Sequence, residues 1–223
     1  MDRVGTPEIL ARTADELSDW RRLAQPLTAR FRAEDDVAGA AFVAAIAQAA
    51  AAAGHAVPEI RLGRGLVDVA LFSVDETGDR CVTAKDLELA LVISGIARSF
   101  ELSSVPGEVA RVELALDTAD LAGTGPFWAV LLTGDAGLLT GDTVFDPSDR
   151  VPAVWFQRSD AHPVPHQRWH LDLWLAPEVA DARIAAAVAA GGTLIDDAQA
   201  PAFTVLADPE GNKVCVCTAL GRA

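Results

Sequence analysis

The sequence is short of cysteine, and it lacks any cluster of basic residues. Its three cysteines include Cys215 and Cys217, and residues two apart on a strand are poorly placed to bridge, so a disulfide framework is excluded. The chain has 18 Lys and Arg against 32 Asp and Glu, a formal net charge of −14. Because contacts to phosphates need clustered positive charge, we expect no nucleic-acid partner.

Long uninterrupted apolar runs are also missing. The longest, residues 37–53, is mostly alanine and contains Gln48, and no basic segment followed by an apolar stretch precedes it. We therefore expect no signal peptide, no membrane span and no membrane partner. A content of 51% hydrophobic and 22% charged residues is typical of one or two globular domains. The chain is expected to be cytoplasmic.

Three widespread catalytic motifs are absent as well. No serine lies in a Gly-x-Ser-x-Gly setting, no Gly-x-x-x-x-Gly-Lys occurs, and no Gly-x-Gly-x-x-Gly follows a strand pattern. Serine hydrolase, nucleoside-triphosphate and dinucleotide functions are therefore disfavoured.

The chain divides into two halves that meet at a predicted linker. Residues 102–107 read Leu-Ser-Ser-Val-Pro-Gly, a composition typical of a linker. Residues 1–106 carry 11 basic and 16 acidic side chains, net −5, whereas residues 107–223 carry 7 and 16, net −9. We predict one domain over residues 1–104 and a second over residues 108–223.

The first half predicts an antiparallel sheet with helices on one face. Asp35 and Asp36 are placed to cap a helix that ends at Gly54. Residues 66–73 alternate like a half-buried strand, and Thr83 with Asp86 resembles a capping box that opens another helix. Helices and strands in this order are typical of an α+β fold.

The second half predicts the pattern strand, helix, strands, repeated twice. Three of its strands alternate, so that Glu113, then His170 with Asp172 and Trp174, and then Cys215 with Cys217 each lie on a face opposite apolar neighbours. Trp174 is placed to line a substrate site, whereas Trp169 points to the core. Arg168, just before its strand, is placed to meet an anionic group or to pair with an acid.

Four segments of this half resemble the vicinal-oxygen-chelate, or glyoxalase-like, superfamily. They are the strand of Glu113 with Phe127-Trp128 after it, Trp155-Phe156-Gln157, residues 168–173, and residues 208–215, which include Asp-Pro-Glu-Gly-Asn. The resemblance implies a pair of βαβββ modules around a small-molecule site.

The resemblance also implies a divalent metal. By position, Glu113 and His170 fall where this superfamily has metal ligands, and the usual carboxylate of the last strand falls on Cys215. A Glu, His and Cys set would suit Zn²⁺ if the three converge within about 2.0–2.3 Å of one point. The alternative is a metal-free site in which Cys215 packs as a small hydrophobe and His170 bonds a neighbour such as Asp172.

The first half resembles pterin-4a-carbinolamine dehydratase over residues 8–100. The supporting segments are Leu17-Ser18-Asp19-Trp20, Phe31-Arg32, residues 42–47, residues 54–60 and residues 82–90. The histidine motif of that family is degenerate here, and His55 is the one candidate catalytic residue left. The resemblance implies a homo-oligomer, a dimer or a tetramer.

These features lead to three functional hypotheses. The first is a lyase or isomerase acting on a small oxygenated or heterocyclic molecule, with Glu113 and His170 as metal ligands or as an acid and base. The second is a non-catalytic protein that sequesters a small molecule, with the first domain serving oligomerisation. The third is retained 4a-hydroxytetrahydrobiopterin dehydratase activity at His55.

Overall fold

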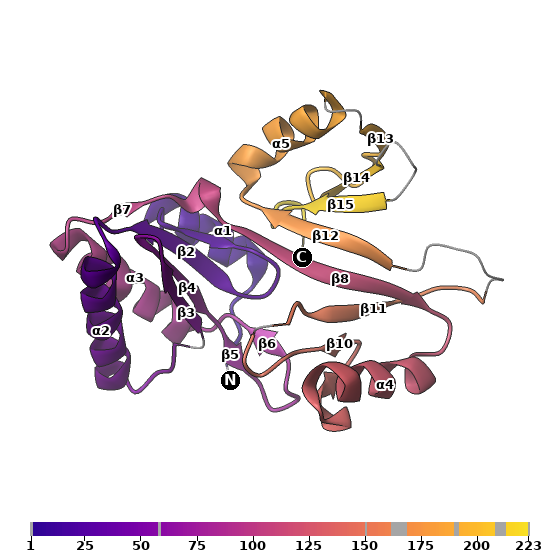
Figure 1. Cartoon of the computed structure of the whole chain (residues 1–223), viewed down its shortest axis with the longest axis horizontal. Coiled ribbons are helices and arrows are strands. Elements are labelled where there is room, and N and C mark those ends of the chain that lie inside the picture. The colour runs from indigo at the N-terminus through magenta and orange to yellow at the C-terminus, as the bar shows by residue number, and fades with distance from the viewer. Residues whose placement is uncertain are drawn as a thin grey trace. The chain divides into compact units, whose positions relative to one another are not determined.

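The computed structural model describes residues 2–57, 59–149, 151–161, 169–189, 192–207 and 213–222. It divides into two compact units, each with its own sheet and helices (Figure 1). Unit 1 comprises Met1–Asp75, Arg80–Val109 and Ala219–Ala223, and unit 2 comprises Glu76–Asp79 and Ala110–Thr218. The predicted α+β class is confirmed. The predicted domain boundary between residues 104 and 108 stays a prediction.

Unit 1 is built on an antiparallel sheet in the order β1-β2-β4-β3, with β7 paired to β2. Its elements are α1 (Thr6–Asp15), β1 (Trp20–Arg22), β2 (Leu27–Arg32), α2 (Asp36–Ala53), β3 (Glu59–Gly63), β4 (Leu66–Leu71), β5 (Ser73–Val74), β6 (Arg80–Cys81), α3 (Ala84–Ser99), β7 (Ser103–Ser104) and the short η1 (Pro106–Glu108). Alternate residues of β2 and β4 form one core with α2 and α3, among them Phe31, Val69, Phe42 and Ile93. The predicted sheet with helices is confirmed.

Helix α2 begins and ends where the sequence predicts. The Asp35 side chain accepts a hydrogen bond from the backbone N–H of Ala38 at 2.8 Å, and Gly54 ends the helix in the left-handed conformation at φ 59°. Among the described residues α2 is the one helix long and apolar enough to cross a membrane, by length and composition alone. Its buried residues recur at helical spacing against the core: Gly39, Phe42, Ile46 and Ala50.

Two features of unit 1 differ from the sequence prediction. The segments α1, β1 and β2 are not predicted, because β1 has three residues and β2 gains its order from pairing with β4, which is distant in sequence. Part of the predicted linker is strand: Ser103 and Ser104 pair with β2 as β7. The Ser, Pro and Gly composition of this segment predicted a linker, but composition carries no information on backbone hydrogen bonds. Pairing of the backbone with β2 makes Ser103 and Ser104 a strand.

Unit 2 contains one sheet of eight strands in the order β13-β14-β15-β12-β8-β11-β10-β9. Its elements are β8 (Ala110–Thr118), α4 (Leu121–Thr133), η2 (Ala136–Leu138), β9 (Leu139–Thr140), β10 (Thr143–Val144), β11 (Val154–Arg158), β12 (Trp169–Leu175), α5 (Pro177–Ala189), β13 (Thr193–Asp196), β14 (Phe203–Ala207) and β15 (Lys213–Cys217). Strand, helix and three strands therefore occur twice, and the first strands of the two modules, β8 and β12, pair antiparallel at the centre. This confirms the predicted pair of βαβββ modules.

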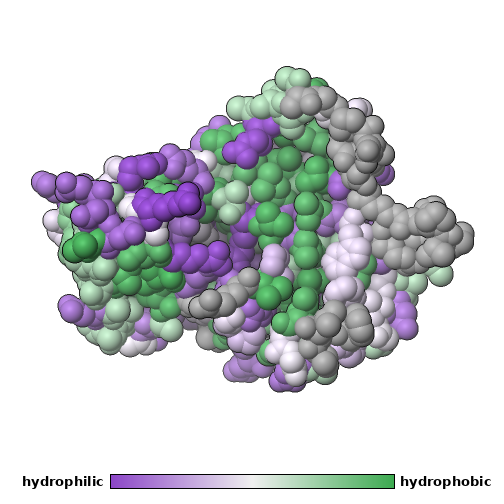
Figure 2. All heavy atoms as spheres, in the orientation of Figure 1, coloured by the Kyte–Doolittle hydropathy of each residue, from purple (hydrophilic) through white to green (hydrophobic). Residues whose placement is uncertain are grey.

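The two faces of this sheet differ in chemistry. On the apolar face, Leu116 and Phe156 pack with α4, and Leu173 and Val216 pack with α5. Trp169 lies on this face edge-on to Trp128 of α4, with ring centroids 5.0 Å apart, as its predicted core position requires. Figure 2 shows apolar side chains gathered over the sheet between α5 and α4. The opposite face, called the polar face below, carries the candidate site.

Candidate functional site

The polar face is assembled by strand register. Asp172 on β12 lies directly opposite Glu113 on β8 and directly opposite Cys215 on β15. Residues paired in this way point to the same side of a sheet, as do residues two apart on one strand, so His170 joins them. The predicted face of each of these strands is confirmed by this pairing.

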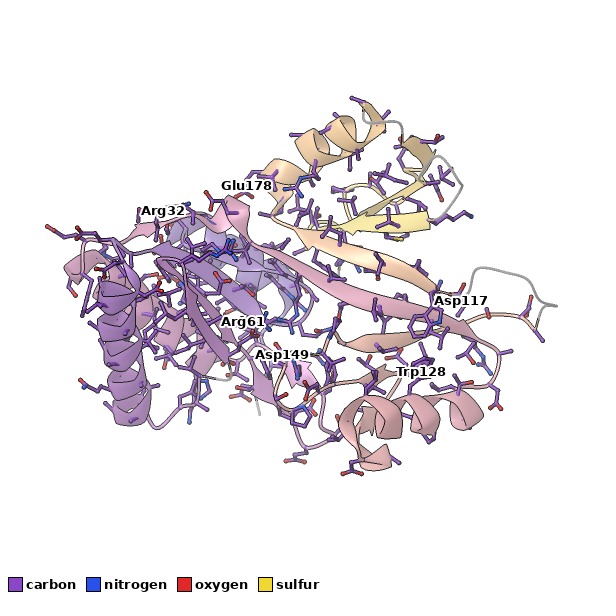
Figure 3. The ribbon with its side chains drawn as sticks, viewed as in Figure 1. Arg32, Arg61, Asp117, Trp128, Asp149 and Glu178 are labelled. Atoms are coloured by element: carbon purple, nitrogen blue, oxygen red, sulfur yellow. The ribbon has the colours of Figure 1, made fainter. Side chains whose placement is uncertain are left out.

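His170 lies at the centre of a hydrogen-bonded network. Its Nδ1 is 3.1 Å from Asp172 Oδ1 and 3.8 Å from Cys215 Sγ. Its Nε2 is 3.2 Å from Gln157 Oε1 on β11 and 3.9 Å from Asp117 Oδ1. Asp117 lies near the carboxyl end of β8 (Figure 3). Four strands therefore contribute a polar side chain to the surroundings of one imidazole.

These neighbours change the protonation of His170. The hydrogen bond to Asp172, followed by that to Cys215, raises the pKa of His170 from 6.5 to about 10, and partial burial opposes this shift. Near neutral pH the ring is therefore an imidazolium, with N–H donors on both nitrogens. The site favours a positive charge at this position.

Two tryptophan indoles hold the two carboxylates. Trp174 Nε1 donates to Glu113 Oε2 at 2.8 Å, and Trp155 Nε1 donates to Asp172 Oδ2 at 3.0 Å. Glu113 and Trp174 are buried, with 4% and 7% of their surface exposed. Trp174 therefore lies on the polar face, as predicted, and it orients Glu113 there.

A divalent metal is implied by the superfamily resemblance, and one set of side chains fits it. Among the described residues, His170, Asp172 and Cys215 are the group of metal-binding side chains whose ligand atoms all lie within 4.8 Å of one another. A nitrogen, an oxygen and a sulfur ligand together suit zinc better than magnesium or calcium. Glu113 lies beside this group in register but is outside it, so its predicted role as a metal ligand stays a prediction.

Some predicted residues lie outside the described part of the chain. They are Arg168, proposed to meet an anionic group, and the Asp-Pro-Glu-Gly-Asn turn at residues 208–212. The structure describes neither of them.

In unit 1, His55 has a partner that the sequence interpretation missed. Its Nε2 is 2.8 Å from Asp86 Oδ1, and Asp86 is fully buried. The other oxygen of Asp86 accepts hydrogen bonds from the Thr83 backbone N–H, the Thr83 hydroxyl and the Ser73 hydroxyl. The sequence indicated Asp86 only as the capping-box residue of α3. Nothing local in the sequence connects Asp86 with His55, 31 residues away.

Comparison with protein families supports both resemblances. Residues 113–217 match the family model of a glyoxalase-like domain, and residues 3–96 match that of pterin 4 alpha carbinolamine dehydratase. No curated protein matches the chain. The fold and the site therefore define a two-domain protein of mixed helices and sheets. It carries a pterin-carbinolamine-dehydratase-like domain followed by a glyoxalase-like domain.

Proposed function

We propose that the glyoxalase-like domain is a small-molecule lyase or isomerase whose reaction centre is the polar face around His170. One observation carries this proposal: His170 is held between Asp172, Cys215 and Gln157, on the same sheet face as the buried Glu113, which lies directly opposite Asp172. A proton acceptor and a positive centre on one face are the two groups that such chemistry needs.

The arrangement supports a division of roles between the two sides of the site. Lyase and isomerase reactions of oxygenated compounds move a proton while negative charge develops on a nearby oxygen. His170, as an imidazolium donor, is suited to bind that oxygen. Glu113, kept in one orientation by Trp174, is suited to take the proton. A divalent cation held by His170, Asp172 and Cys215 would instead replace a proton on His170 and would itself polarise the substrate oxygen.

The substrate class follows from the lining of the site. Acidic groups surround His170, with Asp172 beside it and Asp117 at 3.9 Å, so a polyanion would be repelled. Trp155 stands edge-on to His170, with ring centroids 5.9 Å apart. We therefore expect a neutral or singly charged molecule with a carbonyl or hydroxyl oxygen, such as a hydroxycarbonyl compound or an oxygenated heterocycle.

A panel of such compounds tests the proposal. Thermal-shift binding is measured first, and turnover of the binders is then followed by NMR. We expect Glu113→Gln to keep ligand binding but to lower turnover by at least about 100-fold, since a general base contributes about 10²–10⁴-fold. Val112→Ala, on the opposite face of the same strand, is the matched control and should retain turnover.

The alternative is a protein that sequesters its ligand without changing it. Its support is that both buried carboxylates are already hydrogen-bonded to indoles. A compound that binds the parent tightly and is recovered unchanged would favour this alternative, and finding no turnover of any binder in the panel would overturn catalysis. In that case unit 1 would serve oligomerisation, which light scattering of the purified full chain measures.

Retained dehydratase activity in unit 1 is a second candidate, favoured by the contact of His55 with Asp86. Dehydration of a carbinolamine needs an acid for the departing hydroxyl and a base for a ring proton. The test is formation of quinonoid dihydropterin from 4a-hydroxytetrahydropterin. Activity that is lost in His55→Ala but kept in His170→Ala would support it, and activity that survives His55→Ala would remove His55 from that role.

A further inference from the structure

We propose that the substrate oxygen binds Nε2 of His170 in place of the Gln157 amide oxygen, and that the Gln157 amide then donates a second hydrogen bond to the same oxygen. Gln157 is thereby a catalytic residue that first occupies the oxygen position and then helps to form it. This inference rests on the proposed function, because it names the donors that bind the reacting oxygen.

The two ring nitrogens of His170 have unequal partners. Nδ1 faces the carboxylate of Asp172 at 3.1 Å and Cys215 Sγ at 3.8 Å, whereas Nε2 faces the amide oxygen of Gln157 at 3.2 Å. An ionised acceptor holds an N–H more strongly than a neutral amide does, and 3.2 Å is the long end of the usual N–H···O range. An incoming oxygen therefore replaces the partner of Nε2 more easily than that of Nδ1.

Gln157 is also held less firmly than Asp172. Asp172 is buried, and its second oxygen accepts from Trp155 Nε1 at 3.0 Å. Gln157 is exposed, and its contact with His170 is its one side-chain hydrogen bond among the described residues. Displacement of Gln157 by a substrate thus breaks a single contact at the surface of the site.

The donor on Nε2 follows from the contact itself. An amide oxygen only accepts, so Nε2 carries an N–H where it faces Gln157 Oε1. This N–H is present whether a proton or a cation occupies the Nδ1 side of the ring. A carbonyl or hydroxyl oxygen that takes the place of the amide oxygen therefore meets a donor at once.

A half-turn of the Gln157 amide supplies the second donor. The terminal torsion of glutamine is broad and roughly two-fold, so exchanging the positions of its oxygen and nitrogen costs little. After the half-turn the amide N–H and the Nε2–H of His170 converge on one position. Two donors about 2.7–3.1 Å from an oxygen that gains negative charge form an oxyanion hole.

Asp117 determines the charge that the bound oxygen carries before reaction. It lies directly opposite Gln157 in the register of β8 and β11, and its Oδ1 is 3.9 Å from His170 Nε2. This carboxylate repels an oxygen that is already anionic. We therefore expect a neutral carbonyl or hydroxyl oxygen that becomes negative only during the reaction, so that the two donors bind the transition state more strongly than the substrate.

Exchange of the ring N–H protons tests the unequal hold in the full chain without any ligand. The protein is prepared with isotope-labelled histidine in the presence of a chelator, and His170→Gln assigns the signals. We expect Nε2–H to exchange with water at least about 10-fold faster than Nδ1–H, because a hydrogen bond to a charged group is the stronger. Gln157→Glu should slow the exchange of Nε2–H. A parent in which Nε2–H is the slower of the two overturns the inference.

Two variants of nearly the same size separate the two roles of Gln157. The first probe is hydroxyacetone, a neutral hydroxycarbonyl compound, followed by each panel compound that the parent converts. Gln157→Met should keep affinity within about threefold, whereas Gln157→Glu should weaken it at least about 10-fold, because its carboxylate retains the N–H and repels the oxygen. Turnover should fall about 100-fold or more in both, as for loss of one oxyanion donor.

The matched control is Arg158→Ala, the next exposed side chain of β11 and on the other face of the sheet. It should keep the binding and turnover of the parent. Lactate, an anionic counterpart of hydroxyacetone, should bind the parent more weakly than hydroxyacetone does, and Asp117→Asn should reduce this difference. Circular dichroism checks that each variant is folded.

Parental turnover in Gln157→Met, or parental affinity in Gln157→Glu, would overturn the inference while the proposed function stands. So would binding of a panel compound that leaves the Nε2–H signal of His170 unchanged. The expected order of affinities without turnover of any compound would contradict the proposed function but support displacement of Gln157. If no panel compound binds, the proposed function fails, and the exchange measurement still decides how Nε2 is held.

Discussion

Each unit contains a histidine beside an aspartate, yet the two pairs are built differently. In unit 1, Asp86 uses both oxygens within the fold: it accepts from His55, Ser73 and twice from Thr83. In unit 2, Asp172 lies mid-strand and its partners are His170 and Trp155, with the Cys215 thiol alongside. The first aspartate holds the first turn of helix α3, whereas the second forms a hydrogen bond that favours a protonated His170.

A histidine–aspartate contact does not define a functional site by itself. What differs is the surroundings of the imidazole. His170 has a thiol, an amide oxygen and a second carboxylate within 4 Å of its ring nitrogens, whereas the partner of His55 also serves as the capping-box residue of α3. We therefore place the reaction centre in unit 2, and we expect loss of Asp86 to act first on stability.

The largest expected effect is that of Asp86→Ala. The substitution leaves the Thr83 backbone N–H and the Ser73 hydroxyl without this acceptor in a buried setting, and it also removes the capping box of α3. We expect a loss of about 3 kcal/mol in the free energy of unfolding of unit 1, from unsatisfied donors and the lost cap together. Urea unfolding followed by circular dichroism measures it.

The matched change in unit 2 is Asp172→Ala, which removes the hydrogen bonds of Asp172 with Trp155 and His170. We expect it to cost less stability than Asp86→Ala. If both variants lose the same stability, the contrast between a structural and a functional aspartate is wrong.

The second prediction concerns how the free energy of unfolding of unit 2 depends on pH through His170. In the chain without a bound metal, the raised pKa of His170 means that the folded state binds a proton on this ring more tightly than the unfolded chain does. The resulting stability is fully present below pH 6.5 and is lost as pH rises toward about 10. We expect a loss of about 2 kcal/mol, since one pKa unit corresponds to about 1.4 kcal/mol and solvent screens part of the interaction.

Comparison with His170→Gln isolates this contribution from other titrating groups. The difference in unfolding free energy between parent and variant, measured by urea unfolding at several pH values, should shrink as pH rises through this window. A difference that is constant from pH 6 to pH 10 would show that Asp172 and Cys215 do not hold a proton on His170.

The sequence predicts much of the contrast between the two units, and the rest depends on pairing between strands that are distant in sequence. Alternation along three strands correctly predicts which side chains share the polar face, and Gly54 and the Thr83 capping box correctly predict helix ends. The alternation cannot tell that Asp172 lies opposite Cys215, because register between strands some 40 residues apart is set by the whole sheet. Hence Asp172, and not Glu113, joins His170 and Cys215.

The smallest effect concerns the two indoles that orient the carboxylates. Trp155→Phe and Trp174→Phe keep an aromatic ring but remove the N–H donor to Asp172 and to Glu113, respectively. Each should cost about 1–2 kcal/mol of stability, because a buried carboxylate loses a charge-assisted hydrogen bond. The two variants should differ in function.

Trp155→Phe acts beside Asp172, which belongs to the group of side chains that fits a metal, so it should weaken zinc binding by about 10-fold or more if this group holds zinc. Trp174→Phe acts on Glu113, so it should lower turnover while zinc affinity stays that of the parent. Zinc titration and turnover of the same preparations measure both. If Trp174→Phe were the variant that loses zinc, Glu113 would belong to the ligand set, and the division of the polar face into a metal side and a proton-transfer side would fail.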